Sequence, residues 1–240
     1  MSGPATKDTL LDAGEALFAE HGYAATSLRQ LTERAGVHLA AVNYHFGSKA
    51  ELAKAVLSRR IAPINAERLR RLDALPRRAT VEAIVRAFVE PPLRGGQRLA
   101  HGPAAPAPAH RLCRVFGRIS VEQPLFLRAF LDQQFRKVGE RFASALAIAL
   151  PDQEATTLWW RLHFVVGAMA HTLQNSESLA HRTNGLCDPS DVDALVEHLV
   201  AFAKGGLCAA PSRGAGSRGV GSRRSLAEAA RRHRPRVVRT

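Results

Sequence analysis

The sequence predicts an all-α protein, with an N-terminal three-helix helix-turn-helix domain followed by a larger helical domain. Three observations predict this class. Apolar residues recur at three-to-four spacing along most of the chain, and no convincing alternating strand pattern occurs. Near the N-terminus, two short helical patterns separated by Gly36 lie between two longer ones. The 240 residues are 46% hydrophobic and 23% charged, which is ordinary for a globular chain with a buried core.

The first two helices follow from spacing and capping residues. Residues 7–21 predict an amphipathic helix with an acidic outer face, in which Gly14 permits a close approach by another helix. Thr26 or Ser27 can cap the second helix, because both carry a hydroxyl that accepts from a free backbone N–H. Gly36 ends that helix, since glycine adopts the left-handed conformation most easily.

A third short helix is expected over about residues 39–46, and a fourth begins at Lys49. Ser48 is the expected cap of the fourth helix, with Glu51 three residues later in a capping-box pattern. Two short helices joined by a glycine turn form the helix-turn-helix arrangement, in which the second short helix enters the major groove of DNA.

The run from Thr26 to Leu52 resembles the TetR family of bacterial transcription regulators, and AAVNYHFGSKAELAKAV is its most specific part. Within that family it looks most like the PsrA-like, fatty-acid-responsive regulators. The resemblance implies a DNA-binding domain over residues 6–66 and a helical effector-binding and dimerisation domain over residues 67–204. Residues 205–240 are rich in Gly, Ser and Arg with few large apolar residues, which predicts a disordered basic tail. The chain departs from the family pattern at Thr32, where Ala is common, and at His38, where Ser or Thr is common.

The resemblance also implies which residues contact double-stranded operator DNA. Phenol, imidazole and ammonium groups at the end of the third helix can donate to phosphates, and its exposed face can contact bases. Packing or simple solvation remains an alternative for individual side chains. The candidate DNA-binding residues are Thr26, Arg29, His38, Leu39, Ala40, Asn43, Tyr44, His45 and Lys49.

The remainder of the chain has a helical pattern interrupted by prolines. Pro63 is expected to kink or break the fourth helix, and Pro91-Pro92 to stop a helix that Thr80 caps. Residues 91–110 then form a loop rich in Pro, Ala and Gly. Further helices are expected over residues 111–120 leading on to 123–149, over 152–178 with Asp152 as cap, and over 189–204 with Ser190 or Asp188 as cap.

Residues 152–178 are apolar on nearly every side, so this helix needs several packing partners. The resemblance implies that it and the last helix pack against their symmetry mates in a homodimer. It further implies an effector cavity that holds a fatty acid or acyl-CoA, in which Arg118 or Arg128 meets the carboxylate. Ordinary core packing for the aromatic residues and surface exposure for the arginines are the alternatives. The candidate ligand-binding residues are Phe88, Arg118, Phe126, Phe130, Phe164 and Met169.

Charge and motifs limit the other functions. The net charge is +13, of which residues 205–240 supply +8, from nine arginines and one glutamate. The alternative function is therefore a nonspecific nucleic-acid or membrane-surface protein acting through this tail. No nucleophile, phosphate-binding or zinc-protease motif occurs, so we expect no enzyme, cofactor or metal. Three scattered cysteines, an acidic N-terminus and no long apolar run predict a cytoplasmic protein without a membrane span.

Overall fold

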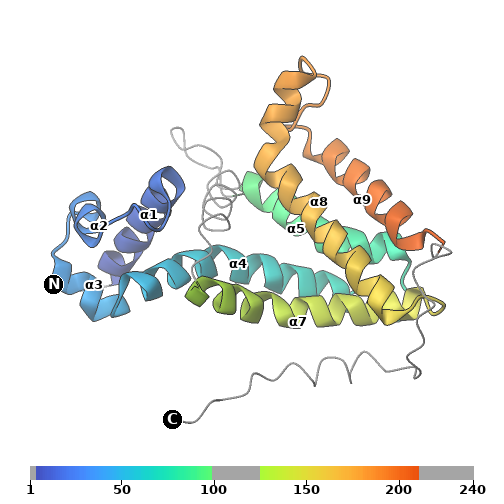
Figure 1. Ribbon diagram of the computed structural model, residues 1–240, viewed down its shortest axis with the longest axis horizontal. Helices are drawn as coiled ribbons and strands as arrows, with labels where there is room; N and C mark the ends of the chain where they lie inside the picture. Colours follow the sequence, from blue (N-terminus) through green and yellow to red (C-terminus); the bar gives the residue numbers. More distant parts are fainter. Residues whose placement is uncertain (1–3, 99–124, 211–240) are drawn as a thin grey trace, which may run out of the picture.

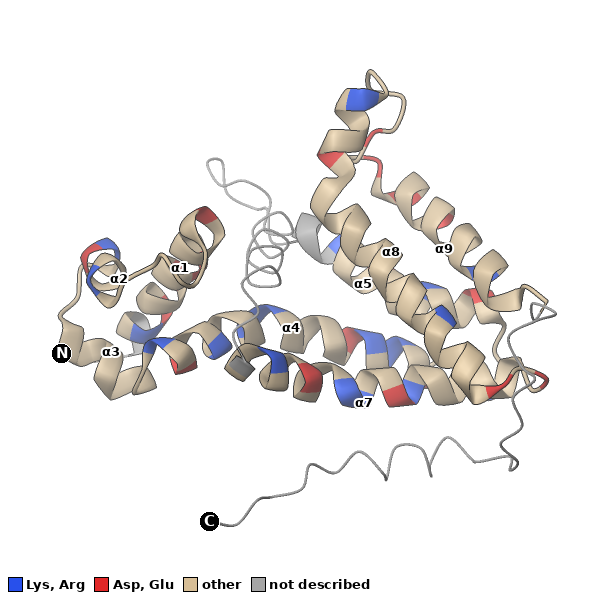
Figure 2. Cartoon of the chain, in the orientation of Figure 1, with Lys and Arg blue, Asp and Glu red and all other residues tan. Residues whose placement is uncertain are grey.

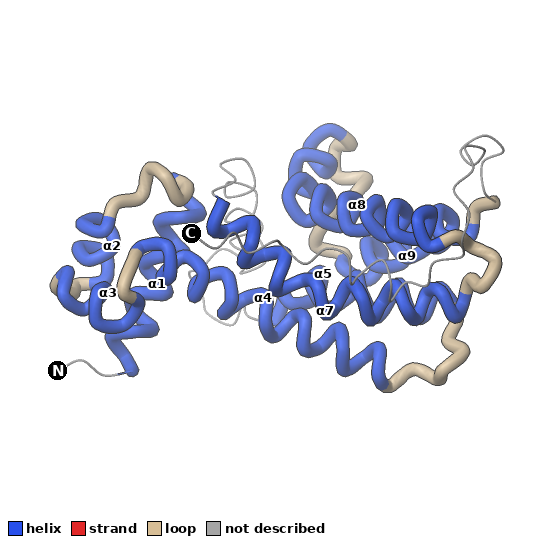
Figure 3. The backbone as a smooth tube through the Cα atoms, turned by 60° about the horizontal axis from the view of Figure 1, so that its bottom comes forward, coloured by secondary structure: helices blue, strands red, loops and turns tan. Residues whose placement is uncertain are grey.

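The computed structural model describes residues 4–98 and 125–210, and every regular element in those two ranges is a helix (Figures 1 and 3). The all-α prediction is therefore confirmed. The helices are α1 (Pro4–His21), α2 (Leu28–Ala35), α3 (Leu39–Phe46), α4 (Lys49–Asp73), α5 (Val81–Arg98), α7 (Leu125–Ala149), α8 (Ala155–Arg182) and α9 (Val192–Cys208).

Helices α1, α2 and α3 form a small head around the first half of α4, at one end of the molecule (Figure 1). Phe18, Leu31, Val42 and Leu52 each contribute a fully buried side chain to its core. Gly14 lies where α1 meets α4, and a Cβ atom at this position would stand 3.0 Å from the Val56 Cγ2 atom. The predicted close approach at Gly14 is confirmed.

The ends of the short helices depend on side-chain caps. Ser27 caps α2 in a complete capping box with Gln30, and Ser48 accepts from the Glu51 backbone N–H at the start of α4. Gly36 ends α2 in the left-handed conformation, with φ at 65°. His38 precedes α3 and makes no side-chain cap.

Glu15 is an exception to the expected acidic outer face of α1. Its carboxylate is buried and accepts hydrogen bonds from Arg59 and Arg60 of α4, each with a contact of 2.8 Å. A buried carboxylate needs such partners because it has lost its hydration. Glu15 therefore ties α1 to α4.

The helix ends predicted at the prolines are wrong, whereas the kink that was the alternative at Pro63 stays a prediction. Helix α4 continues through Pro63 to Asp73, and α5 continues through Pro91 and Pro92 to Arg98. Ile61, just before Pro63, and Leu93, just after Pro92, are both buried. Packing therefore outweighs the roughly 3 kcal/mol that a proline costs inside a helix. Residues 91–98, the first part of the predicted loop over 91–110, are therefore helical. The rest of that predicted loop lies outside the described residues.

Helix α7 joins the head to the rest of the molecule. It lies beside α4, and its first turns reach the head core, where Leu127 is buried (Figures 1 and 3). Further along, Val138, Phe142 and Leu146 of α7 belong to a second core with α5, α8 and α9. Helix α7 thus takes part in both cores, as does α4, which contributes Leu72 to the second core.

Several expected helix ends shift. Helix α8 begins after Glu154, not at Asp152, and Glu154 makes no side-chain cap. Asp191 caps α9 by accepting from the Ala194 N–H, in place of the expected Ser190 or Asp188. Helix α9 extends to Cys208 with Leu207 buried, so the first residues assigned to the tail are helical. Residues 111–124 and 211–240 lie outside the described ranges. Within those ranges, no helix is both long and apolar enough to cross a membrane.

Candidate functional site

Helix α3 has one anchored side and one open side. Val42 is completely buried in the head core, whereas Leu39, Ala40 and Asn43 are exposed and Tyr44 has 76% of its surface open. This division leaves a row of side chains on an eight-residue helix free to contact a groove, as a recognition helix requires. His38, just before α3, is exposed as well.

The polar candidates around α3 differ in their contacts. The Lys49 Nζ atom lies 4.3 Å from the centre of the Tyr23 ring. Arg29 is exposed and forms an ion pair of 2.7 Å with Glu33. The Nε2 atom of His45 is buried without a hydrogen-bond partner among the described residues, and the His45 and Tyr44 rings meet edge to face with their centres 5.0 Å apart.

Thr26 does not belong to this surface. Only 1% of its surface is exposed, and its hydroxyl donates to the Gly22 carbonyl at 2.7 Å. The hydroxyl closes the turn between α1 and α2, so it faces the protein interior. The sequence predicts Thr26 as a donor of its backbone N–H to a phosphate, but with 1% of the residue exposed this N–H is not at the surface of the head. Ser27, and not Thr26, caps α2.

A cavity of about 610 Å³ lies between α4, α5, α7 and α8. Such a volume falls within the usual range of about 300–1,000 Å³ for small-molecule sites. Its wall is mostly apolar, with a few polar groups. The apolar lining includes Ile61, Ile64, Phe88, Pro92, Phe135, Val138, Trp159, Leu162, Val166, Met169 and Leu173, and the polar lining includes Asn65, Arg68, Asp132, His163 and Gln174.

Arg68 is the buried cation of this cavity, with 3% of its surface exposed. Its Nε donates to the Phe88 carbonyl at 2.8 Å, Nη1 to the Asn65 Oδ1 at 3.2 Å and Nη2 to the Met169 sulfur at 3.4 Å. The guanidinium carbon lies 4.3 Å from the centre of the Phe88 ring. Burial lowers the pKa of Arg68 to about 10, so the side chain still carries its charge at neutral pH.

The candidate ligand residues separate into three groups. Phe88 and Met169 line the cavity. Phe126 and Phe130 instead pack against the head, because the start of α7 reaches that core. Phe164 is 61% exposed on α8, outside the cavity, and Arg118 lies outside the described residues.

Sequence reasoning missed Asn65 and Arg68. They follow Ile61 and Ile64 at three-to-four spacing, which places all four on one face of α4. An arginine within a buried helical stripe was the available signal. The helix break expected at Pro63 hid this signal, because the buried face of α4 continues on both sides of that residue.

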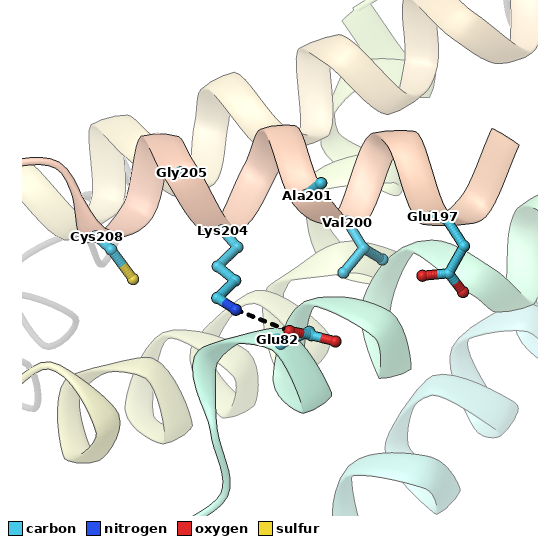
Figure 4. Close-up of a pocket in the computed structure, with 7 residues that line it drawn as sticks. All are labelled: Glu82, Glu197, Val200, Ala201, Lys204, Gly205 and Cys208. Atoms are coloured by element: carbon cyan, nitrogen blue, oxygen red, sulfur yellow. Dashed lines mark hydrogen bonds and ion pairs between the residues drawn. The ribbon is translucent and has the colours of Figure 1, made fainter. Parts of the chain in front are cut away.

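A second, shallower depression lies between α5 and α9 (Figure 4). Lys204 of α9 reaches across it to Glu82 of α5, with an ion pair of 2.8 Å. Its main charged groups are thus already paired, so it offers a weaker binding site than the cavity that contains Arg68.

The outer surface of α8 and α9 is apolar. Trp160 and Phe164 of α8 are 60% and 61% exposed, their ring centres lie 6.0 Å apart, and Phe202 of α9 is 68% exposed. Between Arg161 and Glu177, α8 carries no Lys, Arg, Asp or Glu, and this stretch of α8 is tan in Figure 2. Exposed apolar groups of this size are typical of protein contacts.

Two family profiles match the chain. The profile described as bacterial regulatory proteins, tetR family, matches residues 10–56, and the profile described as tetracyclin repressor-like, C-terminal domain, matches residues 86–206. No curated protein sequence matches the chain significantly.

Solved structures share the fold at low sequence identity. The fatty acid degradation regulator FadR from Bacillus halodurans aligns with a TM-score of 0.61 and 17% identity, over 87% of this chain and 98% of that one. A TetR-like transcriptional regulator from Rhodococcus sp. RHA1 gives 0.60 and 19%, over 84% and 95%. A putative transcriptional regulator from Saccharomonospora viridis, in complex with choline, gives 0.57 and 19%, over 82% and 94%.

Proposed function

This chain belongs to the tetR family of bacterial regulatory proteins, and we propose that it is a repressor that binds a palindromic operator as a homodimer. The anchored and open sides of α3 carry this proposal. Val42 fixes the helix to the head, while Leu39, Asn43 and Tyr44 stay open for bases and phosphates. Lys49 supplies a further positive charge near the phosphates, and His45 would reach them through Nδ1, because its Nε2 atom is buried.

The apolar outer surface of α8 and α9 supports the homodimer. Trp160, Phe164 and Phe202 would become buried between two copies, and Gly167 has open space above it for a close helix contact. A two-fold pair of heads contacts two half-sites, which explains why the operator would be a palindrome.

We propose that the effector is a small apolar acid, such as a fatty acid or acyl-CoA, as in the PsrA-like subgroup. The apolar cavity and its buried arginine support this class. The FadR of Bacillus halodurans, a regulator of fatty acid degradation, is compatible with it. Effector binding would favour a dimer whose heads no longer match the operator spacing, by the difference in its affinity for the two forms.

The first test is a selection of binding sites from a random DNA pool at fixed salt. An enriched palindrome is expected, and its spacing gives the separation of the heads. Operator affinity is then measured with and without fatty acids and acyl-CoAs. Failure to enrich any site, both without ligand and with an acyl ligand present, would count against a sequence-specific dimer.

A chain that ends at residue 210 separates this function from binding through the basic tail. The truncated chain is expected to select the same palindrome, with a weaker dependence of affinity on salt because fewer phosphates lose counterions. Loss of all DNA binding would instead favour the tail.

A further inference from the structure

The cavity contains a buried cation, Arg68, that forms no ion pair with any of the described residues. The three acceptors of Arg68 are a carbonyl, an amide oxygen and a thioether, and all are neutral. A guanidinium has five N–H groups, so these contacts leave it short of acceptors. None of the ion pairs among the described residues includes Arg68. Burying a cation in this way is costly unless an anion binds to it.

We propose that Arg68 binds the carboxylate of the effector, so that the cavity selects free carboxylic acids with an apolar chain over neutral analogues and acyl-CoA thioesters. This inference rests on the proposed function, because it assumes that the cavity is the effector site. It narrows the proposed effector class from fatty acids and acyl-CoAs to the free acids.

The surroundings of Arg68 hold the guanidinium in one position. The Phe88 carbonyl fixes the Nε edge, and the Phe88 ring covers one face of the plane. Asn65 is fixed in turn, because its Nδ2 donates to the Gln134 carbonyl of α7 at 3.0 Å. A carboxylate that meets a preorganised arginine loses little free energy to ordering, and charge-assisted hydrogen bonds are the stronger kind.

The other polar groups of the cavity do not replace this anion. Asp132 and His163 also line it, but neither forms an ion pair with Arg68. Asp132 is exposed on α7, so its charge is screened by water to a larger extent than that of Arg68. Arg68 therefore presents a buried positive charge, with neutral acceptors only, among mostly apolar side chains.

An acyl-CoA does not match this arrangement. In an acyl-CoA the carboxylate of the fatty acid is replaced by a neutral thioester, so the group that would lie beside Arg68 carries no charge. The apolar walls of Ile64, Leu162 and Leu173 suit an aliphatic chain, whereas the phosphates and nucleotide of CoA need polar partners that this lining does not supply. A free acid satisfies both the charge and the walls.

The test compares ligands that differ only at the polar end. Dodecanoate, 1-dodecanol and dodecanoyl-CoA are titrated below their micelle concentrations into the full chain, by calorimetry and by the fluorescence of Trp159 in the wall. The wild-type protein is expected to bind dodecanoate about tenfold or more tightly than the alcohol and the thioester. This comparison needs no variant.

Variants then assign the preference to one residue. Arg68→Gln is expected to bind the alcohol as before and to lose the preference for the acid, and Arg68→Lys to keep part of it. Arg128→Gln, which removes an exposed arginine of α7, is the matched control and should keep the full preference. Thermal unfolding without ligand shows that each variant is folded.

The outcomes separate the inference from the proposed function. Equal affinity for acid and alcohol, tighter binding of the thioester, or a preference that survives in Arg68→Gln would overturn the role of Arg68 alone. Binding of none of the three ligands would overturn both the apolar-acid effector and this inference. An acid preference through Arg68 without any effect on operator affinity would support the inference and contradict release by the effector.

Discussion

Asn43 is the side chain of α3 best suited to distinguish one base from another. It is exposed beside Tyr44, and an asparagine amide can donate to and accept from the same adenine. We expect Asn43→Ala to weaken operator binding by about 1–3 kcal/mol and to relax the preference at one base pair in each half-site. Stability should change little, because the side chain is exposed.

A fluorescence anisotropy titration on the selected operator and on single-base variants measures this effect. Gln133→Ala, which removes an exposed amide of α7 and leaves α3 unchanged, is the control and should bind like the wild type. An equal loss of affinity on every sequence would show that Asn43 contacts the backbone and not a base.

Some side chains near the head could not be assigned from local sequence. Thr26 and Ser27 are adjacent hydroxyls and either fits a cap, but only the folded turn directs Thr26 to the Gly22 carbonyl. Asp12 and Glu15 both form an ion pair with Arg59, but only Glu15 is buried and also meets Arg60, because α4 crosses α1 at that point. The contacts of Glu15 join residues more than forty positions apart in sequence, so its local sequence could not predict them.

At the level of helices, local rules succeeded where the end of a helix is local. Ser27, Gly36 and Ser48 act within one turn, so their sequence positions predict the ends of α2 and the start of α4. The prolines failed as predictors because a helix can keep its course when both flanks are packed. Pro91 is itself buried, so its ring contributes to the core that holds α5 together.

Ion pairs on α4 and between α5 and α9 give the stability a defined pH dependence. Hydrogen bonds from Arg70 and then Arg71 lower the pKa of Glu67 to about 2. A hydrogen bond from Lys204 lowers the pKa of Glu82 in the same way. Because these folded pKa values lie below the unfolded ones, their stabilisation is complete above about pH 5 and is lost as pH falls toward 2.

Urea unfolding between pH 7 and pH 3 tests this dependence. The free energy of unfolding should stay level down to about pH 5 and then decrease, with a smaller decrease in high salt because the pairs are exposed. In Glu67→Gln the decrease should be shallower than in the wild type. The same slope in both proteins would show that other carboxylates account for the acid sensitivity.

Helix α7 is placed to transmit the state of the cavity to the head. Phe126 near its start contacts the Tyr23 ring at 5.2 Å between centres, and Lys49 lies on that same ring. Phe135, further along α7, lines the cavity. We expect Phe126→Ala to bind effector and operator separately much like the wild type, but to reduce the coupling between the two by about 0.5–2 kcal/mol.

Operator affinity measured with and without saturating effector gives that coupling directly. Ile148→Ala, which removes an exposed apolar side chain at the opposite end of α7, should leave the coupling unchanged. Unchanged coupling in Phe126→Ala would mean that another route, such as α4, carries the signal alone.

For the whole molecule, the sequence could predict that α8 needs packing partners on several sides, but not which of its residues face outward. Helix α8 is apolar on several sides, and the structure divides them between the cavity, the core and an open surface. Met169 lines the cavity, Leu158 lies in the core, and Phe164 is exposed. Phe164 is an aromatic residue of the kind that lines such a cavity, but it is exposed on α8 outside the cavity.

The proposed homodimer rests on that open surface, which gives the last prediction. Phe164→Asp would place a charge at the centre of an apolar contact, so sedimentation should show monomers. A single head lacks the second half-site, and operator affinity should fall by about a hundredfold or more. Leu186→Asp makes a matched change at an 87% exposed leucine in the turn between α8 and α9, and should remain dimeric and bind normally. If both variants stayed dimeric, the two-fold contact would have to lie on another surface, and the spacing of the operator half-sites would then reflect that different arrangement of the heads.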